Sequence, residues 1–287
     1  MRLPALPNLF APARTVTERF SRIGWGLTLI YVAIALLCPL LQSWGWLQDP
    51  SEALLNPIHQ PPSWEHWFGT TRQGYDVFAR TLFGTRVALL VVLLGTGLSL
   101  LLGVPLGMVS GYFGGTVDRL LVFLMDTLYT LPGLLLSVTL AFVVGRGIPN
   151  AAIALAIAYV PQYFRLVRSQ TLSVRNEVYV EAAQALGASP VHILRKYLFG
   201  NVVQSIPVLF TINAADAVLI LGSLGFLGLG IPEEIPEWGY DLKQALAALP
   251  TGIWWTALFP GLAMTGLVVA LSLLGEGLSD ALQPQRR

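Results

Sequence analysis

Six segments of this 287-residue chain are long and apolar, and they constrain its fold more than any other feature. An α-helix needs about 20 apolar residues to cross the roughly 30 Å hydrocarbon layer of a bilayer. We therefore predict an all-α integral membrane protein with six transmembrane helices, the third of which is expected to kink at Pro132. The predicted spans cover residues 23–41, 87–109, 120–144, 148–167, 202–224 and 253–274.

The composition agrees with lipid as the solvent for much of the surface. Hydrophobic residues make up 54% of the chain and charged residues only 11%, whereas a soluble domain carries about 25% charged residues. The net charge of +1 gives no reason to expect a nucleic-acid partner. The single cysteine, Cys38, lies in the first apolar segment, and we interpret it as a small apolar side chain outside any disulfide or metal site.

Basic residues near the first segment raise the question of a signal peptide. The apolar run is longer than a typical signal-peptide core, and the residues after it, Leu41-Gln42-Ser43-Trp44, are not a small-residue cleavage site. We predict that the segment stays as a signal anchor. Residues 1–22 would then form a cytoplasmic N-terminal tail, and residues 23–287 a single transmembrane domain.

The distribution of positive charge predicts the orientation. With a cytoplasmic N-terminus, twelve of the 17 Lys and Arg residues fall on the inner side of the membrane and five on the outer side. Because cytoplasmic loops carry an excess of these residues, we expect both termini in the cytoplasm. Segment 42–86 and the acidic loop 231–252 would lie outside, and loop 168–201 would lie inside, between spans four and five.

Small residues recur every four positions in the second predicted span. Side chains four apart share one face of a helix, and small ones let two helix backbones approach closely in lipid. We predict a tight seam with another helix rather than a pore lining. The five positions are Gly95, Ser99, Gly103, Gly107 and Gly111.

The cytoplasmic loop 168–201 carries the sharpest local signal. Its first half is rich in Ala, Leu, Glu and Gln, which favour a helix. Gly187 stands where a helix end favours a left-handed residue. Ser189 then offers an N-cap and Pro190 a first helical position, so a second helix is expected from Pro190 to about Phe199.

A short helix of this kind can dock into a groove on a partner, because several of its side chains are small. The chain contains no Gly-x4-Gly-Lys-[Ser/Thr] phosphate loop. If transport is driven by ATP, the ATPase is therefore another polypeptide.

The loop resembles the EAA loop of ABC importer permeases, which docks in a cleft of the ATPase subunit. The resemblance rests on Glu181-Ala182-Ala183 followed, after three residues, by Gly187, and it departs from the family at Phe199-Gly200, where Leu-Pro is usual. It implies ATPase docking by Glu181, Ala182, Ala183, Gly187 and Ala188. The alternative is a solvated amphipathic connector that rests on the lipid surface.

Other stretches are similar to the C-type subunit of the dipeptide/oligopeptide/nickel transport family, over roughly residues 60–285. They lie within residues 66–87, 224–239 and 257–282. The resemblance implies an ABC-type importer permease of the bacterial cytoplasmic (inner) membrane, without a cofactor or enzymatic activity of its own. It also implies a homologous B-type permease subunit, two ATP-binding cassette ATPase subunits and an extracytoplasmic solute-binding protein as partners. Peptides or related small solutes are the expected cargo, and the sequence does not identify the particular solute.

Two further features suggest parts of a transport pathway. Gly222, Gly225 and Gly228 recur every three residues at an outer helix end, where we weigh a flexible gate against simple tight packing. Asp216 lies near the middle of its span. It is either a group that lines the transport pathway or a protonated, hydrogen-bonded side chain with a structural role. Asp126 lies near the inner surface, two turns from Arg119, and a structural pair or a snorkelling contact is expected there.

Competing functions are a self-contained secondary carrier or channel, and a structural membrane scaffold. A carrier accounts for six spans and Asp216 but not for the loop at Glu181–Gly187, and no inverted repeat is visible. No nucleophile–base arrangement is present, and the three histidines lie in loops without ligand-spaced companions, so neither an enzyme nor a metal site is predicted.

Overall fold

The structure is a computed structural model that describes residues 16–282. These residues form helices joined by turns and loops, with no β-strand and a single isolated bridge between Thr70 and Asp76. The all-α prediction is therefore confirmed for the described part of the chain. The elements are α1 (Val16–Ser43), α2 (Val77–Phe113), α3 (Gly115–Tyr129), α4 (Gly133–Val144), α5 (Ile148–Arg175), α6 (Val178–Ala185), α7 (Pro190–Ile193), the π-helical η1 (Leu194–Leu198), α8 (Phe199–Val202), η2 (Val203–Ser205), α9 (Ile206–Leu227), α10 (Trp238–Ala245), η3 (Leu249–Thr251) and α11 (Trp255–Leu282).

Four helical stretches within the described residues are long and apolar enough to cross a membrane: 19–43, 77–113, 190–227 and 255–279. The pair α3 and α4 qualifies as a fifth, although it is bent by 88° at the break that contains Pro132. The predicted kink at this proline is therefore confirmed, and it is close to a right angle. Helix α5 contains the remaining predicted span and is long enough, but it is less apolar than the others.

Helix α5 packs along α2 through the small-residue stripe. A Cβ atom built on Gly95 would lie 2.8 Å from Leu155 Cβ, one on Gly103 would lie 2.6 Å from Tyr163 Cβ, and one on Gly111 would lie 2.8 Å from Thr171 Cβ. Any larger side chain would therefore push the two helices apart. The predicted seam is confirmed, and its partner is α5.

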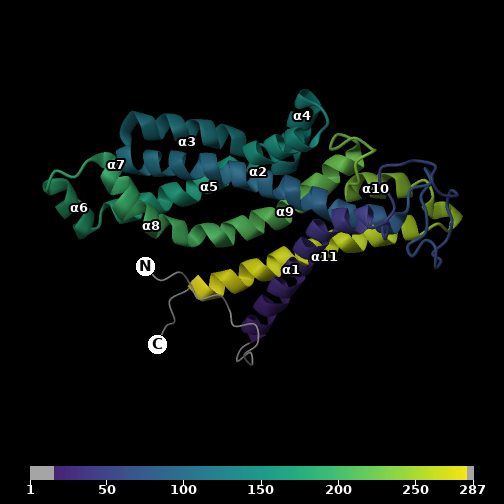
Figure 1. Cartoon of the computed structure of the whole chain (residues 1–287). Coiled ribbons are helices and arrows are strands. Elements are labelled where there is room, and N and C mark those ends of the chain that lie inside the picture. The colour runs from purple at the N-terminus through teal and green to yellow at the C-terminus, as the bar shows by residue number, and fades with distance from the viewer. Residues whose placement is uncertain (1–15, 283–287) are drawn as a thin grey trace.

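The order of these contacts shows that α2 and α5 run parallel, because residue numbers rise together along both helices. The chain between them must therefore return along the bundle. Helices α3 and α4 make this return, and they lie beside α2 and α5 in Figure 1.

Helices α1 and α11 pair in antiparallel fashion. The Tyr31 hydroxyl donates a hydrogen bond to the Ala263 carbonyl at 2.8 Å. Further toward the start of α1, a Cβ on Gly24 would lie 2.7 Å from the carbonyl carbon of Leu273. The beginning of α1 and the end of α11 therefore lie at the same end of the bundle.

The opposite end of the bundle is capped by the segment 44–76 together with α10 (Figure 1). Phe68 stacks on Phe259 of α11 with ring centroids 3.8 Å apart, and the Trp255 indole donates to the Thr70 carbonyl at 3.2 Å. Exposed tryptophans gather in this part of the chain, as is typical of a membrane–water interface. They are Trp44, Trp46, Trp64, Trp67 and Trp254.

Candidate functional site

Helices α6 and α7 form a hairpin at the end of the bundle farthest from α10 (Figure 1). Gly187 follows α6 with φ +80°, the left-handed conformation predicted for it. The Ser189 hydroxyl accepts a hydrogen bond from the His192 N–H at 3.4 Å, and Pro190 begins α7. The residues that predicted a turn between the two helices, Gly187, Ser189 and Pro190, thus form it in the structure.

The second helix of the hairpin continues beyond its expected end near Phe199. The helical segments α7, η1, α8, η2 and α9 follow one another without a loop, so the run extends from Pro190 to Leu227. Gly200 weakens a helix but does not stop it, whereas a proline at this point would remove a backbone donor. The hairpin is therefore joined directly to the membrane helix α9.

The tip of the hairpin is exposed although much of it is apolar. Val180 and Ala183 are buried, whereas the predicted docking residues Glu181, Ala182 and Gly187 are exposed. Ala188, the remaining one, is half-buried. Apolar side chains also stand in solvent here: Leu186 is 89% exposed, Val178 78% and Val191 63%. Large apolar side chains exposed together on one short hairpin point to an interaction site.

Ion pairs join the helices beneath the hairpin. Arg168 of α5 makes a two-pronged contact with Asp118 of α3, at 2.6 and 2.8 Å. Arg165 donates to Asp126 at 2.7 Å, so the partner of Asp126 is Arg165 of α5 and not Arg119. The side chain of Arg119 instead points back along its own helix to the Gly115 carbonyl at 3.4 Å.

Asp216 lies on α9, where one of its carboxylate oxygens accepts a hydrogen bond from the buried Tyr159 hydroxyl of α5 at 2.8 Å. The rest of the Asp216 side chain is exposed on the surface of this single chain. An intramembrane carboxylate with a free face usually lines a cavity or meets a partner. A pathway-lining role for Asp216 stays a prediction.

The three glycines of the expected gate lie in the contact between α9 and α10. Gly222 packs against Met264 and the backbone of Gly239, and Gly225 packs against the Glu237 carboxylate. Gly228 ends α9 in the left-handed region at φ +79°. These contacts support the interpretation that the three glycines permit tight packing. Their role as a gate stays a prediction.

Replacing Gly225 by Ala should loosen the packing of α9 against α10. The added Cβ would collide with the Glu237 carboxylate and come within 2.9 Å of the Tyr240 nitrogen, so we expect a lower apparent melting temperature and reduced uptake. Gly97→Ala is the matched control, because nothing lies within 4 Å of a Cβ at that helical position. Unaltered uptake by a Gly225→Ala/Gly228→Ala chain would remove the gate interpretation.

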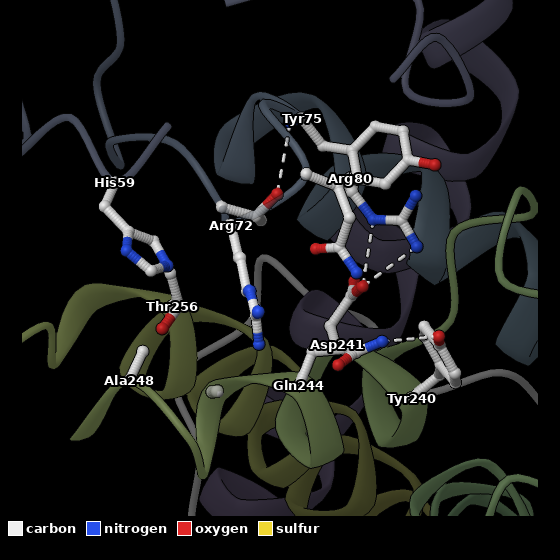
Figure 2. A pocket seen from close by; sticks show the side chains of 12 residues that line it. His59, Arg72, Tyr75, Arg80, Tyr240, Asp241, Gln244, Ala248 and Thr256 are labelled. Atoms are coloured by element: carbon white, nitrogen blue, oxygen red, sulfur yellow. Dashed lines mark hydrogen bonds and ion pairs between the residues drawn. The ribbon is translucent and has the colours of Figure 1, made fainter. Parts of the chain in front are cut away.

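A buried charged cluster beneath α10 was not predicted as a site. The Arg80 side chain, 1% exposed, donates to Asp241 at 2.9 Å, to the Pro50 carbonyl at 3.0 Å and to the Glu233 carbonyl at 3.1 Å. Its guanidinium also lies 4.3 Å from the centre of the Tyr75 ring. Figure 2 shows Arg80 and Asp241 pointing toward each other beside a cavity of about 20 Å³. One arginine of α2 thus connects the segment 44–76, the loop before α10 and α10 itself.

Glu237 begins α10 and is buried next to this cluster. Its carboxylate accepts hydrogen bonds from the backbone N–H groups of Gly239 and Tyr240, each at 2.8 Å. Burial raises the pKa of Glu237 from its ordinary 4.5 to about 8, although these two bonds and Arg80 oppose the rise. At neutral pH the side chain therefore retains its proton in the folded chain.

The stability of the cap formed by residues 44–76 and α10 should fall as the pH rises from about 5 to about 8. Within this window the folded chain holds a proton on Glu237 that the unfolded chain releases, so stability decreases by up to roughly 1.4 kcal/mol per pH unit. Glu237→Gln should flatten much of this slope in apparent melting temperatures measured across the window. Burial also raises the pKa of Asp241, so a slope of the same sign should remain in this variant. A Gln variant with the full slope would contradict the assignment.

The described residues contain no group of three or more His, Cys, Asp or Glu side chains that could hold a metal ion. Comparison with known proteins then identifies the chain. Residues 103–287 match the family model described as the binding-protein-dependent transport system inner membrane component. The chain belongs to this family. It is a permease subunit of an ABC transporter, and it is therefore a multi-pass protein of the bacterial inner membrane and not an enzyme.

Relatives support this assignment over most of the chain. A dipeptide transport system permease from Alkalihalophilus pseudofirmus is 37% identical over 274 residues, which cover 94% of this chain and 87% of the relative. A glutathione transport system permease from Escherichia coli is 35% identical over 270 residues, covering 93% and 89%. A probable D,D-dipeptide transport system permease from Escherichia coli K12 is 34% identical over 264 residues, covering 89% and 86%.

The fold is also found among solved structures. One of them is an inward-facing form of the MetNI methionine ABC transporter, with a TM-score of 0.56 and 19% sequence identity. The match covers 72% of this chain and 97% of that chain. The family assignment also removes the secondary carrier, channel and scaffold as alternatives for this permease.

Proposed function

We propose that this chain is the C-type permease of an importer for peptides or related small solutes, and that it forms half of the translocation pathway. It would pair with a homologous B-type permease, bind two ATPase subunits from the cytoplasm, and receive solute from an extracytoplasmic binding protein. The relatives named for dipeptide and glutathione transport support this cargo class. The observation that carries the proposal is the exposed apolar hairpin tip, which is joined without a break to α9.

The hairpin would work as a lever. An ATPase bound to α6 and its turn would move α7 as well, because Gly187 and Ser189 make a short turn without a flexible linker. The residues that would contact it are Glu181, Ala182, Ala183, Gly187 and Ala188. The continuous helical run from Pro190 then passes the displacement to α9. This helix carries Asp216 and reaches Gly225 at the outer end, so its movement would alter the pathway. Alternating access follows from two bundle states whose populations ATP shifts.

We also propose that the bundle crosses the membrane six times, with α5 as the fourth span and the bent α3–α4 pair as the third. The parallel run of α2 and α5 supports one return crossing between them. Helix α5 needs fewer apolar side chains than the other spans, because α2, α4 and α9 contact much of its surface in place of lipid. Both termini would be cytoplasmic, at the end of the bundle that holds the hairpin and most basic residues.

Residues 1–15 and 283–287 lie outside the described residues, so the proposed tail 1–22 is described only from Val16 onward.

Cysteine crosslinking tests this proposal directly. The only native thiol, Cys38, is 1% exposed, which gives a low labelling background. In an assembled transporter, Leu186→Cys should crosslink to an ATPase subunit and react only with reagents that reach the cytoplasm. Trp64→Cys, at a position that is 96% exposed, should react from the outside. A tagged chain that purifies alone, or a Leu186→Cys chain labelled from outside, would overturn the proposal.

A further inference from the structure

Two cavities adjoin each other at the base of the hairpin, and both are lined by Arg195. The first has a volume of about 520 Å³ and is almost wholly apolar, and the second has a volume of about 530 Å³ and is basic. The volume of the apolar cavity falls within the range of ligand sites, about 300–1,000 Å³, whereas the basic one is a shallow hollow that opens widely to solvent along residues 189–196. The basic cavity includes Val191 of the exposed tip, but neither cavity contains any of the five proposed docking residues or a residue of the proposed pathway.

The apolar cavity lies between α2 and the start of the helical run that leads to α9. Its lining residues are Val104, Pro105, Met108, Val109, Leu194, Arg195 and Phe199. Val109 is four residues and Val104 nine residues from Phe113, the last residue of α2. At 1.5 Å per residue, the part of α2 that lines the cavity therefore lies from roughly 6 Å to roughly 13 Å below this end of the helix.

The basic cavity lies next to it on the cytoplasmic side. It is lined by Ser189, Val191, His192, Arg195 and Lys196. Neither Arg195 nor Lys196 forms an ion pair with any residue between 16 and 282. The only ring contact of Lys196 is a distant one, 6.0 Å from the centre of the Tyr197 ring. Two cations without a carboxylate partner thus stand beside an apolar cavity at the membrane surface.

The backbone places these cations there. Residues Leu194–Leu198 form a π-helical turn within the run that leads to α9. Such turns widen a helix locally and occur frequently at functional sites. On α2, Pro105 faces the same cavity and lacks a backbone N–H. The helical run thus departs from regular α-helical geometry where it faces the cavity, whereas α2 stays α-helical there and lacks one backbone donor.

We propose that the two cavities bind one anionic phospholipid of the cytoplasmic leaflet. An acyl chain would fill the apolar cavity between α2 and Phe199, and the phosphate would meet Arg195 and Lys196. The guanidinium fork of an arginine suits phosphate, and basic pockets between membrane helices on the cytoplasmic side bind anionic headgroups. The site rests on the membrane placement proposed above, and it contains none of the five residues proposed to bind the ATPase.

The experiment uses the transporter purified with its partner subunits and depleted of lipid. Native mass spectrometry counts bound phosphatidylglycerol during a titration, with phosphatidylcholine as the neutral comparison. Arg195→Gln/Lys196→Gln should weaken the saturable phosphatidylglycerol site roughly 25-fold, about fivefold for each cation. Arg119→Gln is the matched control, because this exposed cytoplasmic arginine on α3 lines neither cavity.

A second variant separates the apolar cavity from the cations. Val109→Phe fills part of that cavity and should also lower phosphatidylglycerol occupancy, whereas excess inorganic phosphate should not displace the lipid. Co-purification of the ATPase distinguishes this inference from the proposed function, because the double variant should keep its ATPase. Unchanged phosphatidylglycerol binding in the double variant, or loss of ATPase with lipid binding retained, would overturn the lipid site and assign the cations to the subunit interface.

Discussion

Replacing Gly187 by Glu should abolish solute uptake while the chain still inserts and accumulates in the membrane. Gly187 has φ +80°, which an L side chain rarely adopts. A Cβ there would meet nothing within 4 Å, so the substitution causes no clash inside this chain. The damage would fall on the turn between α6 and α7 and on the surface offered to the ATPase. Uptake of labelled solute and co-purification of the ATPase measure both effects.

Gly187→Asn is the control that separates backbone conformation from bulk and charge. Asparagine enters the left-handed region more easily than most residues, so the turn should survive and uptake should stay well above that of the Glu variant. If Gly187→Glu chains transport normally with their ATPase attached, the hairpin tip does not transmit force. Equal loss in the Asn and Glu variants would indicate that any side chain at this position blocks docking.

Replacing Arg80 by Met should cost about 3–5 kcal/mol of stability, because it leaves the buried carboxylate of Asp241 without its partner. The same change removes the contacts that Arg80 makes with the backbone carbonyls of Pro50 and Glu233. Without the guanidinium nothing opposes desolvation of Asp241, so its pKa should rise further. The apparent melting temperature of the purified complex measures the loss.

The double variant Arg80→Met/Asp241→Leu provides the decisive comparison. Removing both charges leaves no unpaired ion, so much of the lost stability should return. A double-mutant cycle then gives the coupling energy of the pair. If the double variant is as unstable as the sum of the two single variants, the ion pair contributes nothing beyond the packing of each side chain.

Local chemistry explains which parts of the fold could be predicted from the sequence. The small-residue stripe from Gly95 to Gly111 needs only the period of a helix to indicate a close seam. The turn at Gly187, Ser189 and Pro190 depends on conformational preferences that act within a few residues. For both features the responsible residues are adjacent in sequence or on one helix face, so the pattern alone was sufficient.

Other features depend on geometry that no local pattern contains. Pro132 predicts a kink but not a bend of 88°, because the angle is set by what packs on either side. Asp126 pairs with Arg165 from another helix rather than with Arg119 on its own. The contact between Arg80 and Asp241 joins residues 161 positions apart. The sequence offered one signal for this pair, an acidic loop at 231–252 on the same predicted side as Arg80.

That separation of 161 positions also has a consequence for biosynthesis. At about 5–20 residues per second, a ribosome takes on the order of ten seconds or more to reach Asp241 after Arg80 has emerged. During that interval α2 can already pair with α5, while the Arg80 guanidinium still lacks the Asp241 carboxylate. The cap formed by residues 44–76 and α10 is therefore among the last parts of the molecule to fold. In a nascent chain stalled before α10, the Arg80 side chain should be exposed to solvent.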